Sequence, residues 1–433
     1  MPLRLAAAIL LAAAAALAQA PPSFTLAGDW DVLVSVSGVN PQTVRVAPVA
    51  LLSVTAERYD DLPLFNPKAG GWVRGAQLKG VKAQETTSPF LVDVPSFTLR
   101  AGPEPGSTLF IKDTDYTIDP DWGTFGRLPN GRIQPGQPVF ATYRHAQTRL
   151  DAIVLSPNGR ISIQQGEPRA AAPAVPPLEP GNRHLGNIYL PGLLPRLSND
   201  NFFPILEQSF PEQVLPRSPT IQRLTHRLNA GHSIRILAWG DSVTDGVYLP
   251  NKNTQRWQEQ FVARLRARFP KARIELLTEA WGGRNTGSYL AVPPGNPHNY
   301  RETVLALKPD LVVSEFVNDA GLKPHQVQER YASLLTDFRS IGAEWIILTP
   351  HYVRPDWMNL ASQRDIDDDP RPYVAGLRQF AASHDVALAD ASLRYGRLWR
   401  QGIPYNALML NAINHPDARG MRLFADALMA LFP

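Results

Sequence analysis

Four short polar clusters in the C-terminal half of the chain hold side chains that could carry out catalysis. In chain order they are Gly240-Asp241-Ser242, Gly282-Gly283, Asn318-Asp319 and His415-Pro416. A serine hydroxyl is a poor nucleophile until an adjacent base takes its proton, and histidine suits that task near neutral pH. Ser242 and His415 are therefore a candidate nucleophile and base for attack on a carbonyl carbon.

The two middle clusters could stabilise the negative charge that develops on the carbonyl oxygen during such an attack. A glycine lets the backbone approach a ligand closely and offer its N–H group, and the side-chain amide of Asn318 can donate in the same way. Each cluster alone also fits a simple turn or a helix cap, because Ser, Asp, Asn and Gly are common there. The interpretation depends on the four clusters occurring together.

The pattern of hydrophobic residues predicts alternating strands and helices in this half of the chain. Apolar runs predict strands near residues 234–239, 274–278, 311–316, 345–348 and 386–389. Helical spacing of apolar residues follows near residues 257–269, 327–341 and 423–431. This alternation predicts a parallel sheet with helices on both faces. Ligands bind outside the carboxyl ends of the strands in such sheets, where three of the clusters are expected.

With these motifs, residues 232–433 resemble the SGNH/GDSL hydrolase family of esterases and acetylesterases. The resemblance implies a flavodoxin-like, three-layer α/β/α domain that cleaves carboxylic esters without a metal or other cofactor. It implies that Ser242 is the nucleophile and His415 the base. It also implies an oxyanion hole formed by the N–H groups of Ser242 and Gly283 and by the side chain of Asn318. Gly283 is preferred over Gly282 because a Gly-Arg pair followed by small polar residues is similar to the glycine block of sugar acetylesterases in the family.

The chain departs from the family pattern at two positions. Phe316 stands where the family usually has a glycine, and Ala412 stands where it has the acid of the triad, three residues before the histidine. The candidates for the group that orients His415 are Asn411, Asn414, a backbone carbonyl, Asp390 and Asp417. We expect a Ser-His dyad held by a backbone carbonyl or an asparagine side chain, because the third group mainly orients the base and stabilises its charge.

The N-terminal part of the chain has a different pattern. Short alternating runs, with Asn130-Gly131 and Asn158-Gly159 between them, predict an all-β, sandwich-like domain over residues 21–165. Three tryptophans of this domain are predicted to be core residues rather than a sugar-binding face. They are Trp30, Trp72 and Trp122.

Residues 166–219 are predicted to connect this domain to a catalytic domain at residues 220–433. The stretch 170–177 is Pro-rich and of low complexity, which favours an extended linker. The apolar pair Phe202-Phe203 indicates that the rest of the connector packs along one of the domains. Because all four polar clusters follow the connector, we expect the β-domain to be dispensable for hydrolysis of small esters.

Residues 1–20 have the features of a secretory signal peptide, with Arg4, an apolar run over residues 5–17 and Ala18-Gln19-Ala20 as the cleavage site. The apolar run is shorter than the ~20 residues that span a bilayer. No later stretch is long and apolar enough, so we expect a secreted or periplasmic protein without a membrane span after cleavage. The absence of cysteine excludes disulfides and a cysteine nucleophile, and a net charge of only +4 gives no support to nucleic-acid binding.

Together these features predict an exported serine esterase whose preferred substrate is an O-acetyl group on a polysaccharide or a cell-wall glycan. The predicted substrate class rests on export, on the added β-domain and on the similarity of Gly283-Arg284 to sugar acetylesterases. A lipase or arylesterase that acts on small acyl esters is the alternative with the same chemistry. A non-catalytic glycan-binding protein on a degenerate hydrolase fold is the alternative of another class, which Ala412 keeps open.

Overall fold

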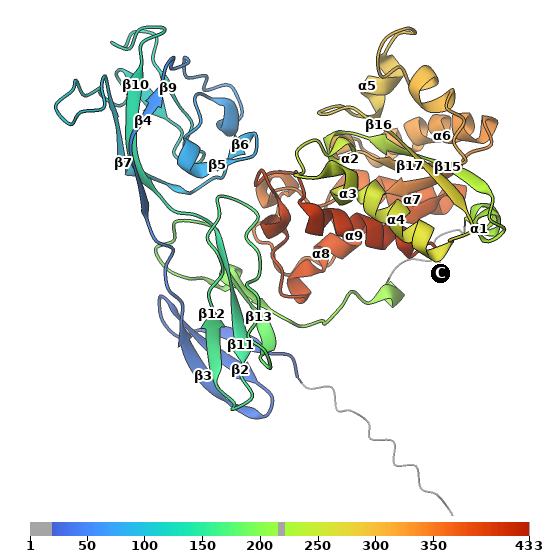
Figure 1. The fold of residues 1–433 in the computed structure, drawn as a ribbon, viewed down its shortest axis with the longest axis horizontal. Helices are drawn as coiled ribbons and strands as arrows, with labels where there is room; N and C mark the ends of the chain where they lie inside the picture. The colour runs from blue at the N-terminus through green and yellow to red at the C-terminus, as the bar shows by residue number, and fades with distance from the viewer. Residues whose placement is uncertain (1–19, 215–220, 433) are drawn as a thin grey trace, which may run out of the picture.

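The computed structural model describes residues 20–214 and 221–432 (Figure 1). The predicted signal peptide, apart from its last residue, lies outside the described residues, as does the end of the predicted connector. In the part of the chain that the structure describes, no helix is both long and apolar enough to cross a membrane. An all-β region precedes an α/β domain, as the hydrophobic pattern predicts.

A five-stranded parallel sheet forms the centre of the C-terminal domain. Its strands lie in the order β16-β15-β17-β18-β19, which is the flavodoxin-like order. They are β15 (Ser233–Gly240), β16 (Arg273–Ala280), β17 (Leu311–Glu315), β18 (Glu344–Leu348) and β19 (Ala387–Ala389). The strand order reverses between β15 and β17, and sheets of this kind bind ligands at the carboxyl end of the strands at that switch point.

Helices cover both faces of this sheet. They are α1 (Gln222–Asn229), α2 (Ser242–Asp245), α3 (Lys252–Gln255), α4 (Trp257–Arg268), α5 (Thr286–Ala291), α6 (Pro324–Ser340), α7 (Pro372–His384), α8 (Ala391–Gly396) and α9 (Ala418–Met429). Successive residues of a strand point to opposite faces. In β15, Ile236 and Ala238 pack into a core with α4 and α9, whereas Leu237 and Trp239 pack into a second core with α6 and α7. This burial on both faces confirms the predicted α/β/α layers.

The N-terminal region contains a β-sandwich, which confirms the prediction of an all-β, sandwich-like fold. One sheet has the order β1-β2-β3 and the other has the order β12-β11-β13-β14. The strands are β1 (Ser23–Leu26), β2 (Asp31–Val36), β3 (Val39–Arg45), β11 (Arg149–Leu155), β12 (Ile161–Gln164), β13 (Arg183–Leu190) and β14 (Phe202–Pro204). Val32 and Val34 of the first sheet share a core with Ile153 and Ile188 of the second.

Residues 52–145 form a second β-module, which is inserted into the sandwich between β3 and β11. Its main sheet has the order β4-β10-β7, and two hairpins, β5–β6 and β8–β9, accompany it. The strands are β4 (Leu52–Tyr59), β5 (Lys82–Ala83), β6 (Thr86–Thr87), β7 (Val92–Arg100), β8 (Tyr116–Ile118), β9 (Phe125–Arg127) and β10 (Val139–His145). This inserted module has its own core around Phe97 and Phe125. Figure 1 shows β5 and β6 on its side nearest to the C-terminal domain.

The predicted connector at residues 166–219 is not a linker along its whole length. Both β13 and β14 lie within it, and β13 pairs with β11 because its apolar residues can be buried in a sheet. Beyond β14 the chain runs onto the C-terminal domain. There the N–H groups of Leu206 and Glu207 donate to the carbonyl oxygen of Arg400 at 2.7 and 2.8 Å.

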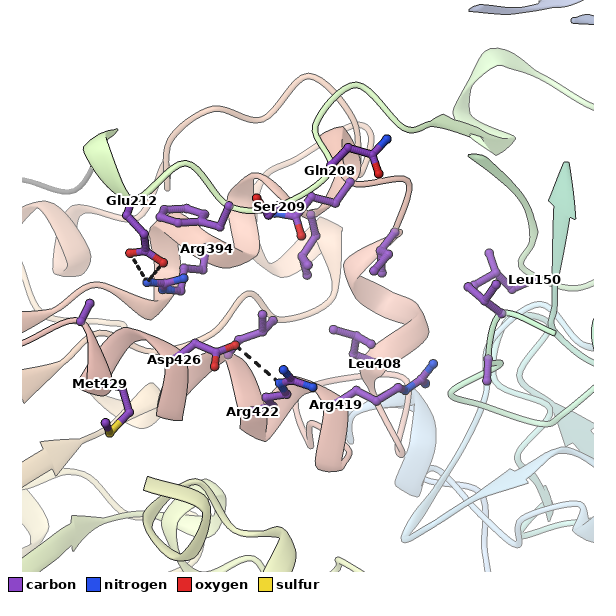
Figure 2. Close-up of a pocket in the computed structure, with 18 residues that line it drawn as sticks. Leu150, Gln208, Ser209, Glu212, Arg394, Leu408, Arg419, Arg422, Asp426 and Met429 are labelled. Atoms are coloured by element: carbon purple, nitrogen blue, oxygen red, sulfur yellow. Dashed lines mark hydrogen bonds and ion pairs between the residues drawn. The ribbon is translucent and has the colours of Figure 1, made fainter. Parts of the chain in front are cut away.

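The sandwich and the C-terminal domain share one hydrophobic core. Leu150, Tyr189 and Phe203 of the sandwich belong to the same cluster of buried side chains as residues of β15, α4 and α9. A cavity of about 850 Å³ lies at this junction. Its lining includes Leu150, Leu408 of the C-terminal domain and Gln208 of the connector (Figure 2). The sandwich is therefore packed onto the C-terminal domain rather than tethered to it.

Truncation of Phe203 to alanine should destabilise both parts of the protein together. Phe203 is fully buried in the shared core, and Phe→Ala substitutions at such sites cost about 3–5 kcal/mol. Urea unfolding, followed by tryptophan fluorescence and circular dichroism, should show one transition at a lower midpoint than in the wild type. Leu26→Ala, at a 45% exposed position of β1, is the control and should barely move the midpoint. Two separate transitions, of which only one moves, would contradict the shared core.

Candidate active site

The structure brings Ser242 and His415 together. Ser242 is the first residue of α2 and comes two positions after the end of β15, so it lies at the carboxyl edge of the sheet. His415 lies in the loop that precedes α9. Its Nε2 atom is 3.2 Å from Ser242 Oγ, although the two residues are 173 positions apart in the chain. This is the contact that a nucleophile needs with its base.

The two residues line a cleft of about 520 Å³ between the C-terminal domain and the inserted module. The residues that the sequence analysis proposed for the site all line it, namely Ser242, Gly283, Asn318 and His415. Four residues of the inserted module line it as well, namely Trp72, Gln84, Glu85 and Thr86. Small-molecule sites in proteins have volumes of about 300–1,000 Å³. One wall of the site thus comes from a region where the sequence analysis placed no site residue.

Three backbone N–H groups of residues that line the cleft have no acceptor among the described residues; they belong to Ser242, Gly282 and Gly283. The N–H of Ser242 is free because it lies in the first turn of a helix. Gly283 has φ of +71°, a left-handed conformation that favours glycine. A Cβ added to Gly282 would lie 3.8 Å from the Cβ of Ser242. Gly283 therefore remains a candidate donor to an oxyanion, and Gly282 joins it.

Asn318 is held in the cleft by Asp241. Its backbone N–H and its Nδ2 atom donate to Asp241 Oδ2 at 3.0 and 2.9 Å. The other carboxylate oxygen of Asp241 accepts from the N–H of Val243 at 3.1 Å and so caps α2. A side-chain amide has two N–H bonds, so one remains for a ligand. Asp241 thus fixes both the turn that carries Ser242 and the side-chain amide of Asn318, which lines the same cleft.

Burial changes the ionisation of the carboxyl groups behind the cleft. Asp241, Glu315 and Asp319 are almost completely buried. Burial raises the pKa of Asp241 to about 6 and that of Asp319 to about 6 as well. Burial and the charge of Asp241 raise the pKa of Glu315 well above its usual range. Because Asp241 accepts hydrogen bonds on both oxygens, its role in the site requires the ionised form, which predominates above about pH 6.

The imidazole ring of His415 is held on three sides. It stacks on the ring of Tyr248 at a centroid distance of 4.1 Å and an angle of 3°. Its Nδ1 atom lies 2.7 Å from Gln84 Oε1 and 3.1 Å from Glu85 Oε1. The loop that carries it is shaped by Asn411, whose Oδ1 accepts from the N–H groups of residues 413, 414 and 415 at 2.9–3.0 Å. The ring can therefore turn only its Nε2 edge toward Ser242.

The prediction that a backbone carbonyl or an asparagine side chain is the partner of His415 Nδ1 is wrong. Asp390 and Asp417 do not take the role either, because Asp390 pairs with Arg378 and caps α8, and Asp417 caps α9. The partners are Gln84 and Glu85, which come from the inserted module. The run 82–87 lacks the glycine, asparagine or aspartate that marks a two-residue hairpin turn, and no signal in it indicates catalysis.

An acidic side chain at position 412 would not reach His415, although the triad acid of the family stands at this position. Ala412 has φ of +57°, and it lines a separate cavity together with Ser88 and Phe90. The cleft is lined instead by its neighbours Asn411 and Ile413. A longer side chain at position 412 would thus extend away from His415.

The structure also shows where Phe316 and the three tryptophans of the N-terminal region lie. Phe316 is buried and packs edge-on against Trp239 at 4.8 Å, so it belongs to the sheet core and not to the cleft. Trp122 is buried and Trp30 packs against the sandwich core, as predicted. Trp72 differs from the prediction, because it lines the cleft and lies between Trp122 and Trp357, 5.3 Å from each ring.

Fold and site together define an α/β domain with a serine–histidine pair at its strand ends. The model of the GDSL-like Lipase/Acylhydrolase family matches residues 238–423, a range that contains all the predicted site residues of the C-terminal domain. The C-terminal half of the chain therefore matches a family of ester-bond hydrolases. No curated protein matches the chain significantly.

Solved structures resemble the same half of the chain at low identity. One is LAE5, an α/β hydrolase from the metagenome of Lake Arreo, Spain, with 21% identity over 46% of this chain and 94% of that chain and a TM-score of 0.37. A two-domain esterase (CEX) active on acetylated mannans has 16% identity over 49% of this chain and 52% of that chain, with a TM-score of 0.39. A variant of Axe2, an acetyl xylan esterase from Geobacillus stearothermophilus, has 19% identity over 46% of this chain and 94% of that chain, with a TM-score of 0.37.

Replacement of Asp241 by asparagine should lower kcat with little change in KM. An amide keeps one acceptor oxygen, so either Asn318 or the N–H of Val243 loses its partner. A buried donor without a partner costs about 1–3 kcal/mol, which corresponds to a fall of about 5- to 160-fold in kcat if the loss acts on the transition state. Asp390→Asn is the matched control, because Asp390 caps α8 outside the cleft. Equal losses of kcat per folded molecule in the two variants would contradict the role given to Asp241.

Proposed function

We propose that the protein hydrolyses carboxylic esters by nucleophilic attack of Ser242, with His415 as the general base. The observation that carries this proposal is the 3.2 Å contact between Ser242 Oγ and His415 Nε2 inside the cleft. The contact also disfavours the alternative of a degenerate, non-catalytic fold, because nucleophile and base are both present and face each other.

The steps follow from the positions of these groups. His415 Nε2 takes the proton of Ser242 as Oγ attacks the carbonyl carbon of the ester. The oxyanion that forms accepts hydrogen bonds from the N–H groups of Ser242 and Gly283 and from Asn318 Nδ2. The protonated imidazole then gives its proton to the alkoxide, which leaves as the alcohol, and an acyl-serine remains. Water, deprotonated by His415, releases the acid and restores Ser242.

The preferred substrate is an O-acetyl group on a polysaccharide or a cell-wall glycan. Among the residues that line the cleft, Val247 and Ile413 are the aliphatic ones, and the others are polar, aromatic or glycine. Such a lining suits a polar alcohol better than a long acyl chain, which disfavours a lipase. Trp72 and Trp357 form an aromatic wall, and Trp357 is 47% exposed. Exposed aromatic rings offer an apolar face on which the C–H face of a sugar ring can pack.

Export is part of the proposal. Its support is the sequence of residues 1–20, with Arg4, the apolar run and the small residues Ala18 and Ala20 around the cleavage site. A secreted or periplasmic location would bring the enzyme to acetylated glycans outside the cytoplasm.

Ser242→Ala should abolish ester hydrolysis without affecting the fold. Loss of the nucleophile is expected to lower kcat on 4-nitrophenyl acetate by about 10⁴- to 10⁶-fold. Ser242 is a partly exposed first residue of α2, so the melting temperature should change little. Acetate release at the wild-type rate by this variant would rule out the proposed mechanism.

Trp357→Ala should raise KM for an acetylated glycan but leave 4-nitrophenyl acetate hydrolysis unchanged. Aromatic contacts contribute about 0.5–1.5 kcal/mol, which predicts a rise of roughly 2- to 12-fold in KM. Phe90→Ala is the matched control, because Phe90 is an exposed aromatic residue that lines the neighbouring cavity and not the cleft. The glycan assignment fails if Trp357→Ala leaves the KM for the glycan unaltered, or if both substrates lose activity in parallel.

A further inference from the structure

The hairpin β5–β6 of the inserted module ends in a two-residue turn at the catalytic histidine. Its strands, Lys82–Ala83 and Thr86–Thr87, leave Gln84 and Glu85 at the tip. Gln84 has φ of +56°, a conformation that costs energy for a residue with a side chain. Such strain persists where surrounding contacts determine the conformation, and here the contacts are with the loop that carries His415.

Two hydrogen bonds join the hairpin to that loop. Thr86 Oγ1 donates to the carbonyl oxygen of Asn411 at 2.7 Å. The Nδ2 atom of Asn411 donates in turn to Glu85 Oε1 at 2.8 Å. The carbonyl oxygen of Glu85 accepts from Gln77 Nε2 at 2.7 Å, which ties the tip of the hairpin back to its own module. Glu85 is thereby fixed from both sides.

We propose that Glu85, carried by the inserted β-module, is the acid partner of His415, so that the Ser242–His415–Glu85 triad is completed across two domains. Gln84 is the neutral companion that shares the Nδ1–H group with Glu85. This inference rests on the proposed function, since it assigns the third member of the same site. It makes Glu85 and Gln84 positioning residues, which act on the substrate through His415.

The contact between Glu85 Oε1 and His415 Nδ1 fixes the tautomer of the imidazole ring. An ionised carboxylate can only accept hydrogen bonds, so Glu85 requires a proton on Nδ1. The lone pair of the neutral ring is then on Nε2, which faces Ser242 Oγ. Gln84 alone would not impose this state, because its amide can turn and donate from nitrogen instead.

The charge of Glu85 also stabilises the imidazolium that forms when His415 takes the proton. Burial tends to raise the pKa of Glu85, but its hydrogen bond with His415 and the charge of that ring outweigh burial, and the pKa lies below its usual range. Glu85 is therefore ionised when the enzyme works near neutral pH.

Other titratable groups near His415 do not replace this charge. Tyr248 is stacked on the ring, and burial raises its pKa well above the usual value, so it is neutral. His351 lies behind the loop, bonded to the carbonyl oxygen of Asn414, and burial holds its pKa well below the usual value, so it is neutral too. Asp241 and Asp245 lie on the Ser242 side of the cleft, where Asp241 is engaged by Asn318.

The experiment is the isosteric substitution Glu85→Gln in the full chain, with 4-nitrophenyl acetate as substrate. Loss of the acid partner should lower kcat by about 10²- to 10⁴-fold, with KM changed less than threefold. A carboxylate beside the ring favours its protonated form, so removal of the charge of Glu85 should make protonation of His415 less favourable. The acid limb of the profile of kcat/KM against pH, which requires neutral His415, should then move to lower pH.

Two control variants separate this role from a structural one. Glu104→Gln removes an exposed acid elsewhere in the inserted module and should change neither kcat nor the pH profile. Gln84→Ala removes the neutral acceptor, so it should lower kcat by less than tenfold and leave the acid limb in place. NMR titration of the His415 ring in Ser242→Ala, with and without Glu85→Gln, measures the shift in the histidine pKa without reference to activity.

The outcomes distinguish this inference from the proposed function. If Ser242→Ala is inactive while Glu85→Gln keeps the wild-type kcat and acid limb, the Ser-His pair works as a dyad and the interdomain triad is overturned. If Ser242→Ala keeps its activity, the proposed function itself fails. A fall in kcat without any shift of the acid limb or of the His415 titration would show that Glu85 only holds the hairpin, and would also overturn the proposal.

Discussion

A single imidazole ring has to face two partners at once, and the rest of the structure serves that constraint. His415 Nε2 lies 3.2 Å from Ser242 Oγ, and its Nδ1 lies 2.7 and 3.1 Å from Gln84 and Glu85. A ring can satisfy both contacts only if its plane and its position along the cleft are fixed. Stacking on Tyr248 fixes the plane, and the hydrogen bonds of Asn411 fix the loop. The parallel sheet holds the nucleophile in place, since Ser242 begins a helix just beyond the end of strand β15.

This constraint gives the N-terminal region a structural task. The β5–β6 hairpin must stay within hydrogen-bond distance of the His415 ring, which a flexible linker between the domains would not allow. The sandwich is packed on the C-terminal domain through the core that contains Phe203 and Tyr189, and it carries the inserted module between two of its strands. The inserted module makes further contacts of its own: the guanidinium of Arg354 lies over the ring of Trp122 at 4.6 Å, and Trp357 packs on Trp72. The wall of the cleft and the partner of His415 are therefore held by the same interface.

The C-terminal half could be predicted from the sequence because its signals are local. A strand, a turn and a helix lie within a few residues of Ser242, and the order of the four polar clusters along the chain indicated which strand ends would meet. The partner of His415 could not be predicted, since Gln84 is 331 residues away and its hairpin has no distinguishing composition. The same limit applies to β13 and β14. Neither has the alternating pattern of a half-exposed strand. The pairing of β13 with β11 and of β14 with β13 depends on tertiary packing, so that a segment predicted as connector belongs to the sandwich sheet.

The absence of an acid at position 412 and the presence of Glu85 at the hairpin are best understood as one feature. In the left-handed conformation of Ala412, a side chain extends toward the cavity beside Ser88 and not toward His415. The turn is imposed by Asn411, whose side-chain oxygen gathers three successive N–H groups and whose amide nitrogen reaches Glu85. The same loop geometry thus directs the side chain at position 412 away from His415 Nδ1 and brings Asn411 within hydrogen-bond distance of Glu85. An arrangement of this kind couples catalysis to domain contact, because an opening between the two domains would withdraw Glu85 and Trp72 from the cleft together. The hydrolase domain then has its full machinery only while the β-module covers the cleft.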